Sequence, residues 1–178
     1  TTSGHYFRFL QEIPLYTSND YSLANGFDYK KYFEPLDGIT SAISIFGKMI
    51  NSLNDEDVRI SNRLNLPEKK LRGFESGKIG PVDEGNFVGG NYAMSLNYST
   101  KIPLLPDLQT ADFKFFIDAG NVWGIDYSST IDDSNKIRSS IGIAADWFTP
   151  IGPLSFSFAQ DLSSHKNDKT EAFRFNLG

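Results

Sequence analysis

A chain of 178 residues with 39% apolar and 22% charged side chains is long enough for one folded domain and too apolar for simple disorder. Its net charge of -5 argues against a general nucleic-acid binder, and the absence of cysteine excludes disulfides and thiolate metal sites. The 15 Phe, 8 Tyr and 15 Gly favour β structure with tight turns. No apolar run reaches the roughly 18 residues of a membrane helix, but the strands of a membrane barrel remain compatible with a mean hydropathy of -0.33.

Three segments in the first 50 residues carry strand-like patterns. Residues 5–13 and 39–49 alternate apolar and polar side chains, and 29–36 is a strand with two mixed faces. Asn25-Gly26 predicts a turn before the second strand, and Asp37-Gly38 predicts a hairpin between the second and the third.

The alternation resumes after residue 90 and predicts five more strands. They span 91–99, 112–123, 138–148, 154–161 and 173–177, with turns or polar loops at 102–107, 128–135, 149–153 and 163–170. About eight strands result, and each has one face of large apolar residues and one of small or polar residues. An all-β antiparallel fold is therefore expected.

The polarity of the two faces allows two interpretations. In a soluble barrel or sandwich the apolar faces point inward, whereas in a membrane barrel they face lipid. The polar faces here are dominated by Ser, Gly, Ala and Asn, and Trp123, Trp147 and Phe148 lie near strand ends as girdle residues do. We favour the membrane barrel, although periodicity by itself does not distinguish inside from outside.

Residues 51–88 interrupt the alternation and contain Leu71-Arg72-Gly73-Phe74. A lone arginine in such a loop is by default exposed. Ordered loops of this length are usually functional, however, and we expect this one to fold back into the lumen.

Catalytic and metal-binding patterns are not found. His5 and His165 lie far apart, no nucleophile has a recognisable base, and the acidic residues 55–57 lack the regular spacing of calcium ligands. We expect neither an enzyme nor a cofactor.

Four groups of residues, in this order, resemble the BamA family of outer-membrane protein assembly factors, within the bacterial surface antigen superfamily of insertases. Leu71-Arg72-Gly73-Phe74 resembles the family's (V/I)RGF loop motif, and Gly89-Gly90-Asn91 its GGN. Residues 116–123, with Phe116, Asp118 and Gly120, resemble its FxDxGxxW strand, and 138–142 with 149–154 its last hairpin. The resemblance implies that residues 1–178 are a single transmembrane β-barrel domain fragment, half of a sixteen-stranded barrel, in the bacterial outer membrane.

The resemblance also implies a site. In the family the loop arginine lies inside the barrel and pairs with acids on neighbouring strands; here Arg72 would pair with Asp118, which the alternation places on the polar face. Asn97 occupies the position of a second acid. Its substitution leaves as alternatives a weaker pairing or recruitment of Glu75 or Asp146.

The implied function is insertion and folding of β-barrel proteins through a weak barrel seam. The implied partners are the lipid bilayer, unfolded outer-membrane protein clients and, for the full-length parent, accessory lipoproteins; no nucleic acid is expected. A passive porin-like or structural barrel, and a soluble lipocalin-like ligand binder, are the alternatives. Eight strands with two free edges would either close as a small barrel, whose narrow lumen would displace the loop, or pair with a second copy as a homodimer.

Overall fold

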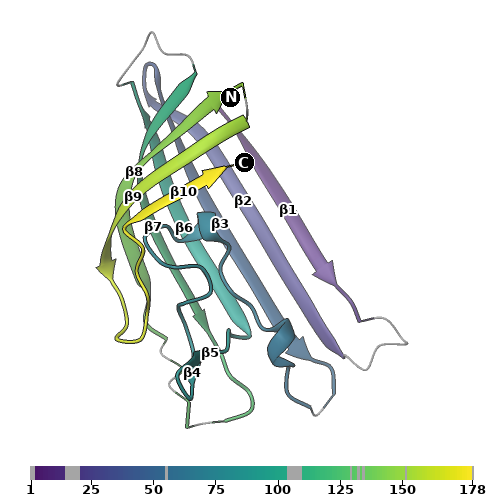
Figure 1. The fold of residues 1–178 in the computed structure, drawn as a ribbon. Helices are drawn as coiled ribbons and strands as arrows, with labels where there is room; N and C mark the ends of the chain where they lie inside the picture. The colour runs from purple at the N-terminus through teal and green to yellow at the C-terminus, as the bar shows by residue number, and fades with distance from the viewer. Residues whose placement is uncertain are drawn as a thin grey trace.

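Eight strands form one antiparallel sheet in the order β1-β2-β3-β6-β7-β8-β9-β10 (Figure 1). The structure is a computed structural model that describes residues 3–14, 21–54, 56–103, 110–128, 130–131, 133, 135–150 and 152–177. Parts of the predicted turns and loops at 102–107, 128–135 and 149–153, Asp55 of the acidic run, and the chain ends at 1–2 and 178 lie outside the described residues.

The eight predicted strands are all present, which confirms the all-β antiparallel fold. They are β1 (Gly4–Glu12), β2 (Ser22–Leu36), β3 (Ile39–Ser52), β6 (Tyr92–Ile102), β7 (Ala111–Trp123), β8 (Arg138–Thr149), β9 (Gly152–Ser163) and β10 (Phe173–Leu177). Between β3 and β6 the loop holds two short 3-10 turns, η1 (Ile60–Asn62) and η2 (Glu68–Lys70), and a small hairpin of β4 (Val82–Asp83) and β5 (Asn86–Phe87). No helix among the described residues is long and apolar enough to cross a membrane.

The turn predicted at Asn25-Gly26 is wrong. Both residues lie inside β2, where Gly26 pairs with Leu10 of β1 on one side and Lys48 of β3 on the other. Continuous pairing with two neighbours overrides the local turn preference, so β2 runs for 15 residues. The hairpin at Asp37-Gly38 is correct, and Gly38 has the positive φ of 77° that such a turn requires.

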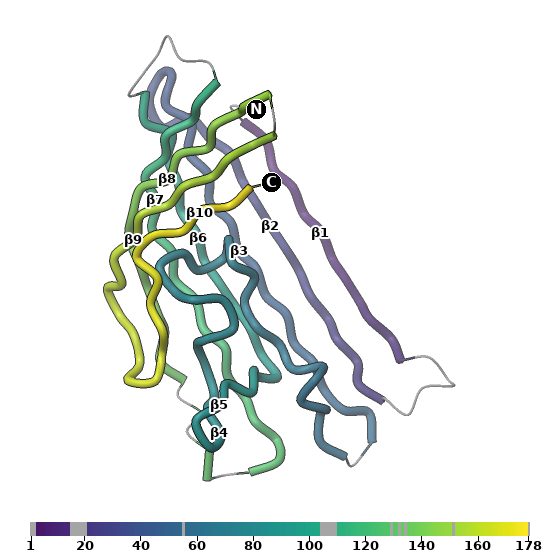
Figure 2. Tube along the Cα trace, in the orientation of Figure 1, coloured from purple at the N-terminus to yellow at the C-terminus, as the bar shows by residue number. Residues whose placement is uncertain are grey.

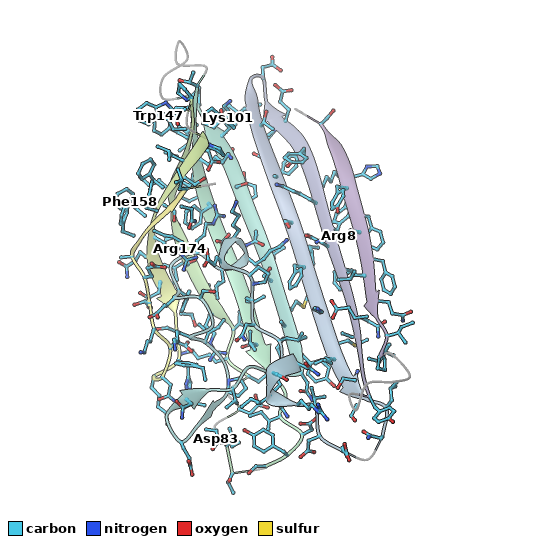
Figure 3. All side chains as sticks on the ribbon, turned by 45° about the vertical axis from the view of Figure 1, so that its right-hand side comes forward. Arg8, Asp83, Lys101, Trp147, Phe158 and Arg174 are labelled. Atoms are coloured by element: carbon cyan, nitrogen blue, oxygen red, sulfur yellow. The ribbon has the colours of Figure 1, made fainter. Side chains whose placement is uncertain are left out.

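The apolar faces point outward. Phe9, Leu96 and Phe158 are 61%, 50% and 54% exposed, whereas Ser95 and Ser140 on the other face are at most 1% exposed. Figure 3 shows Trp147 and Phe158 on the outer side of the sheet. This polarity is that of a membrane barrel wall and contradicts the soluble lipocalin-like alternative, in which the apolar faces would be buried.

The sheet is open. β1 pairs only with β2, and β10 only with β9, so these two strands form the edges (Figure 2). The alternative of a closed eight-stranded barrel is therefore wrong for this structure, because β1 and β10 do not pair with each other.

The loop of residues 51–88 covers the concave inner face of the sheet, in contrast to the displacement that a closed small barrel would cause. The core lies between them and contains loop residues together with wall residues of β2, β3, β6 and β7: Ala24, Ile50, Val58, Leu64, Leu66, Leu71, Phe74, Ile79, Ala93 and Val122. The loop supplies most of these side chains, so it is part of the folded core.

Candidate functional site: the arginine loop on the inner face

Arg72 makes a bidentate ion pair with Asp118 in the middle of β7. Arg72 Nε donates to Asp118 Oδ2 at 2.7 Å and Nη2 to Oδ1 at 2.8 Å, while the Arg72 backbone N–H also donates to Oδ2 at 3.1 Å. The Asp118 side chain is fully buried and that of Arg72 is 18% exposed. The pairing implied by the family resemblance is thus present, and the default interpretation of Arg72 as an exposed loop residue does not hold.

Phe116 forms the floor under the guanidinium. The Arg72 Cζ lies 3.6 Å from the centroid of the Phe116 ring, in cation–π contact, and Phe116 has no exposed surface. The Arg72 carbonyl accepts a hydrogen bond from Ser140 of β8. Arg72 is therefore attached to two adjacent strands.

Asn97 completes the environment of the carboxylate from β6. It lies directly opposite Asp118 in the strand register, and its Nδ2 donates to Asp118 Oδ1 at 2.9 Å and to the Lys70 carbonyl at 2.8 Å. Of the alternative partners, Glu75 is exposed, and Asp146 binds Lys114 instead. Asn97, at the position of the family's second acid, is thus a neutral donor to Asp118. The single carboxylate of Asp118 balances the single guanidinium of Arg72.

The other residues of the loop motif hold the backbone against the wall. Leu71 and Phe74 are 3% and 2% exposed in the core. Gly73 has a φ of 90°, and a Cβ there would lie 3.0 Å from the Cβ of Ala159 and 3.1 Å from that of Ser140. Only glycine combines this backbone conformation with so close an approach to β8 and β9.

The strand-motif glycines serve close packing as well. A Cβ on Gly90 would overlap the Trp123 backbone, and one on Gly120 would lie 2.8 Å from Leu66 Cδ1 of the loop. Gly89 has a φ of 71° and lies against the Leu64 carbonyl, to which the Gly90 N–H donates. These contacts fix the base of the loop on the ends of β6 and β7.

A second buried arginine, Arg63, also anchors the loop base. Its guanidinium donates to Asn91 Oδ1, to the Val58 carbonyl and to Asp126, beyond the end of β7. Burial acts to raise the pKa of Asp126, but hydrogen bonds from the Val58 N–H, Asn91 and Arg63 outweigh it, so the pKa lies below its ordinary value. Asn91 of the GGN motif therefore orients a charged cluster.

Sequence reasoning missed a further ion pair between Arg138 and Asp168. Arg138, the first residue of β8, and Asp168, between β9 and β10, have fully buried side chains joined by two hydrogen bonds of 2.9 and 3.0 Å. Arg138 lies in the segment 138–142 that resembles the family's last hairpin, but Asp168 lies in a polar loop without pattern. The only available signal was a charged residue at the start of an otherwise apolar and small strand.

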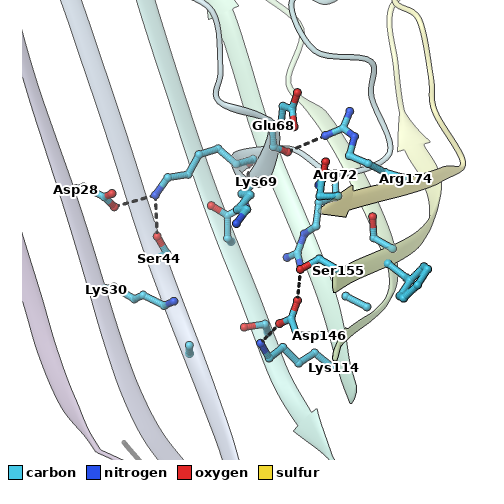
Figure 4. A pocket seen from close by; sticks show the side chains of 18 of the residues that line it. Asp28, Lys30, Ser44, Glu68, Lys69, Arg72, Lys114, Asp146, Ser155 and Arg174 are labelled. Atoms are coloured by element: carbon cyan, nitrogen blue, oxygen red, sulfur yellow. Dashed lines mark hydrogen bonds and ion pairs between the residues drawn. The ribbon is translucent and has the colours of Figure 1, made fainter. Parts of the chain in front are cut away.

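Charged side chains line a cavity of about 420 Å³ on the inner face of the sheet, beside Arg72 (Figure 4). Lys70 binds Asp28 and Ser44, and Lys114 binds Asp146. Among the described residues, no group of three or more His, Asp or Glu could hold a metal ion. The arrangement is suited to fixing a loop inside a polar lumen.

These features define the class: part of the wall of a transmembrane β-barrel with an arginine-bearing loop seated in its lumen. The chain belongs to the Omp85 superfamily, whose domain model matches residues 1–178. Domains of this family form outer-membrane barrels, which places the chain in the outer membrane.

The chain is similar in sequence to proteins of a bacterium and of the mouse, and in structure to a second bacterial protein. The chain is 32% identical over 146 residues to the outer membrane protein assembly factor BamA of Neorickettsia risticii, covering 78% of this chain and 18% of that protein. It is 30% identical over 133 residues to the sorting and assembly machinery component 50 homolog of Mus musculus, covering 70% and 28%. The crystal structure of BamA from Haemophilus ducreyi lacking POTRA domains 1-3 superposes with a TM-score of 0.87 and 26% identity, over 98% of this chain and 38% of that one. The chain thus spans a minor part of these relatives.

Proposed function

We propose that this chain is the carboxy-terminal barrel part of an outer-membrane protein assembly factor, which inserts and folds β-barrel proteins into the bacterial outer membrane without enzymatic chemistry. The observation that carries the proposal is the loop held on the inner face by the Arg72–Asp118 ion pair. The family assignment and the similarity to assembly factors over most of the chain support it.

The physical basis of insertion is a barrel seam that is held weakly. β1 and β10 are the two edges of the sheet and do not pair with each other. An unpaired strand edge is a template for another strand, and in lipid each unsatisfied backbone group costs several kcal/mol. A client strand would pair with this edge by strand addition.

The arginine loop would keep the rest of the wall in shape while the seam exchanges partners. Its core contacts and ion pair hold β6, β7 and β8 together. The edge strand would then be the part of the wall that opens. The proposed partners are the lipid bilayer, unfolded outer-membrane clients and, for the full-length parent, accessory lipoproteins.

An Arg72→Ala variant of the full-length parent tests the proposal against a passive porin-like barrel. We expect normal insertion of the variant itself at reduced temperature but slower assembly of a client barrel into proteoliposomes, because the loop loses its charge anchor. Client assembly is followed by protease resistance, and Arg59→Ala, an exposed loop arginine, is the matched control. Unchanged client assembly together with normal solute conductance would favour the passive barrel.

A further inference from the structure

Arg174 of the edge strand β10 binds the arginine loop directly. Its Nη2 donates to the Phe74 carbonyl at 2.7 Å and its Nη1 to the Glu68 carbonyl at 3.1 Å. Its side chain is 11% exposed and lies on the inner face of β10, directed toward Glu68 as Figure 4 shows. A single side chain therefore joins the last strand to the loop.

The two acceptor carbonyls lie on opposite sides of Arg72 in the sequence. Glu68 begins η2, just before the loop motif, and Phe74 is the motif's last residue. A planar guanidinium with several fixed N–H donors can bind both carbonyls at once, whereas the single ammonium of lysine cannot reproduce this fork. Glu171 accepts from Arg174 Nε at 2.7 Å and balances its charge.

The segment between β9 and β10 adds a second connection. Phe74 forms an antiparallel bridge with Thr170, and the Glu171 N–H donates to the Gly73 carbonyl at 3.0 Å. Lys169 exchanges two further backbone hydrogen bonds with the loop, one from the Glu75 N–H and one to the Lys78 carbonyl. The arginine loop thus has an extended backbone contact with the residues that lead into β10.

We propose that Arg174 is a positioning residue that couples the terminal edge strand to the arginine loop. These contacts hold β10 from its inner face, in addition to its ladder with β9. Loss of the Arg72–Asp118 pair would then loosen β10, and loss of Arg174 would loosen the loop, since a coupling free energy acts equally in both directions. The coupling itself is argued from the contacts of Arg174. An effect of this coupling on seam opening rests on the proposed function.

Amide hydrogen exchange of the full-length parent in lipid nanodiscs tests the coupling, because it measures local opening segment by segment. We expect Arg174→Ala to speed exchange of residues 173–177 and also of residues 71–78, each by about 5- to 150-fold, the usual range of coupling between sites. Arg174→Lys should restore only part of the protection. Asn176→Ala, two residues further on the same face of β10, is the matched control and should leave both segments unchanged.

The reciprocal variant, Asp118→Asn, alters the loop anchor without touching β10. It should speed exchange of residues 173–177, and this remains measurable if Arg174→Ala does not fold. Faster exchange of only residues 173–177 in Arg174→Ala, or of only residues 71–78 in Asp118→Asn, would overturn the proposal. Normal client assembly by Arg72→Ala alongside coupled exchange would refute the proposed function and leave the coupling intact.

Discussion

The ion pair of Arg72 and Asp118 is stable in a buried position because every part of it has a partner. The carboxylate accepts from the guanidinium, the Arg72 backbone N–H and Asn97, and the guanidinium lies on the Phe116 ring. Two charges taken out of water are costly unless their geometry is good and the remaining donors and acceptors are satisfied. Asn97 meets this condition without adding a second negative charge.

A double-mutant cycle measures how much Arg72 and Asp118 depend on each other for the stability of the fold. Asp118→Ala should destabilise the fold by about 3–5 kcal/mol, because it leaves the Arg72 charge without its carboxylate. The double variant Arg72→Ala with Asp118→Ala should be less destabilised than the sum of the single variants. Urea unfolding in lipid vesicles gives the values, and Asp112→Ala, which removes the partly exposed partner of Lys101, is the control. Additive effects would show that the two residues do not act as a pair.

At the scale of elements, β7 and β8 form the surface on which the loop lies. Phe116, Asp118 and Gly120 follow one another at every second position on the inner face of β7. The Phe116 ring and the Asp118 carboxylate contact Arg72, and Gly120 leaves space for Leu66. On β8, Gly142 lies opposite Phe116 in the register and leaves room for its ring. The pleat of the sheet thus sets the spacing of the site.

Gly142→Ala tests whether the strands must approach this closely. An added Cβ would overlap the Phe158 carbonyl and lie 2.6 Å from Phe116 Cζ, so β8 and the ring would both have to move. We expect a loss of about 1–3 kcal/mol, as is typical of overpacking, in the same urea unfolding assay. Gly26→Ala is the matched control, because a Cβ there meets Lys48 Cγ at an ordinary 3.4 Å. Equal stability of the two variants would contradict a packing role for Gly142.

At the scale of the whole molecule, the open sheet has lipid-facing apolar residues on one side and the polar loop on the other. Its core needs the loop, since the inner wall by itself offers mainly small and polar side chains. The edges β1 and β10 remain as unpaired ladders. In lipid such edges require partners, which the rest of a larger barrel would supply.

The 178-residue chain expressed alone should therefore form a homodimer through its edges. Two copies of an eight-stranded wall offer enough strands to close a barrel, and pairing satisfies backbone groups that lipid cannot. Light scattering in detergent, corrected for bound detergent, gives the mass. Phe7→Pro in the edge strand β1 should weaken the dimer, because proline lacks the N–H that strand pairing uses; a monodisperse monomer would refute the expectation.

Much of the fold could be predicted from the sequence, because alternation reports directly which residues share a face. The strands and the polar face of Asp118 followed from period-two patterns. The pairing of Arg72 was implied only by the family resemblance that the ordered motifs carry. Asn25-Gly26 was misassigned because turn preference is local, whereas β2 is held by two neighbours. Arg138–Asp168 was missed because Asp168 lies in a loop without pattern, and Arg174 was missed because it binds backbone carbonyls, which residue types do not reveal.

The sequence by itself determined the strands, the polarity of their faces and the residue types of the loop motif, since these depend on local geometry and on residue identity. Only the tertiary structure decided that the apolar faces point outward, that the sheet stays open, and that Asn97, Arg138 and Arg174 bind the loops. These outcomes depend on which distant segments meet across the lumen. Contacts of that kind arise from the curvature and register of the whole sheet, which no local pattern encodes.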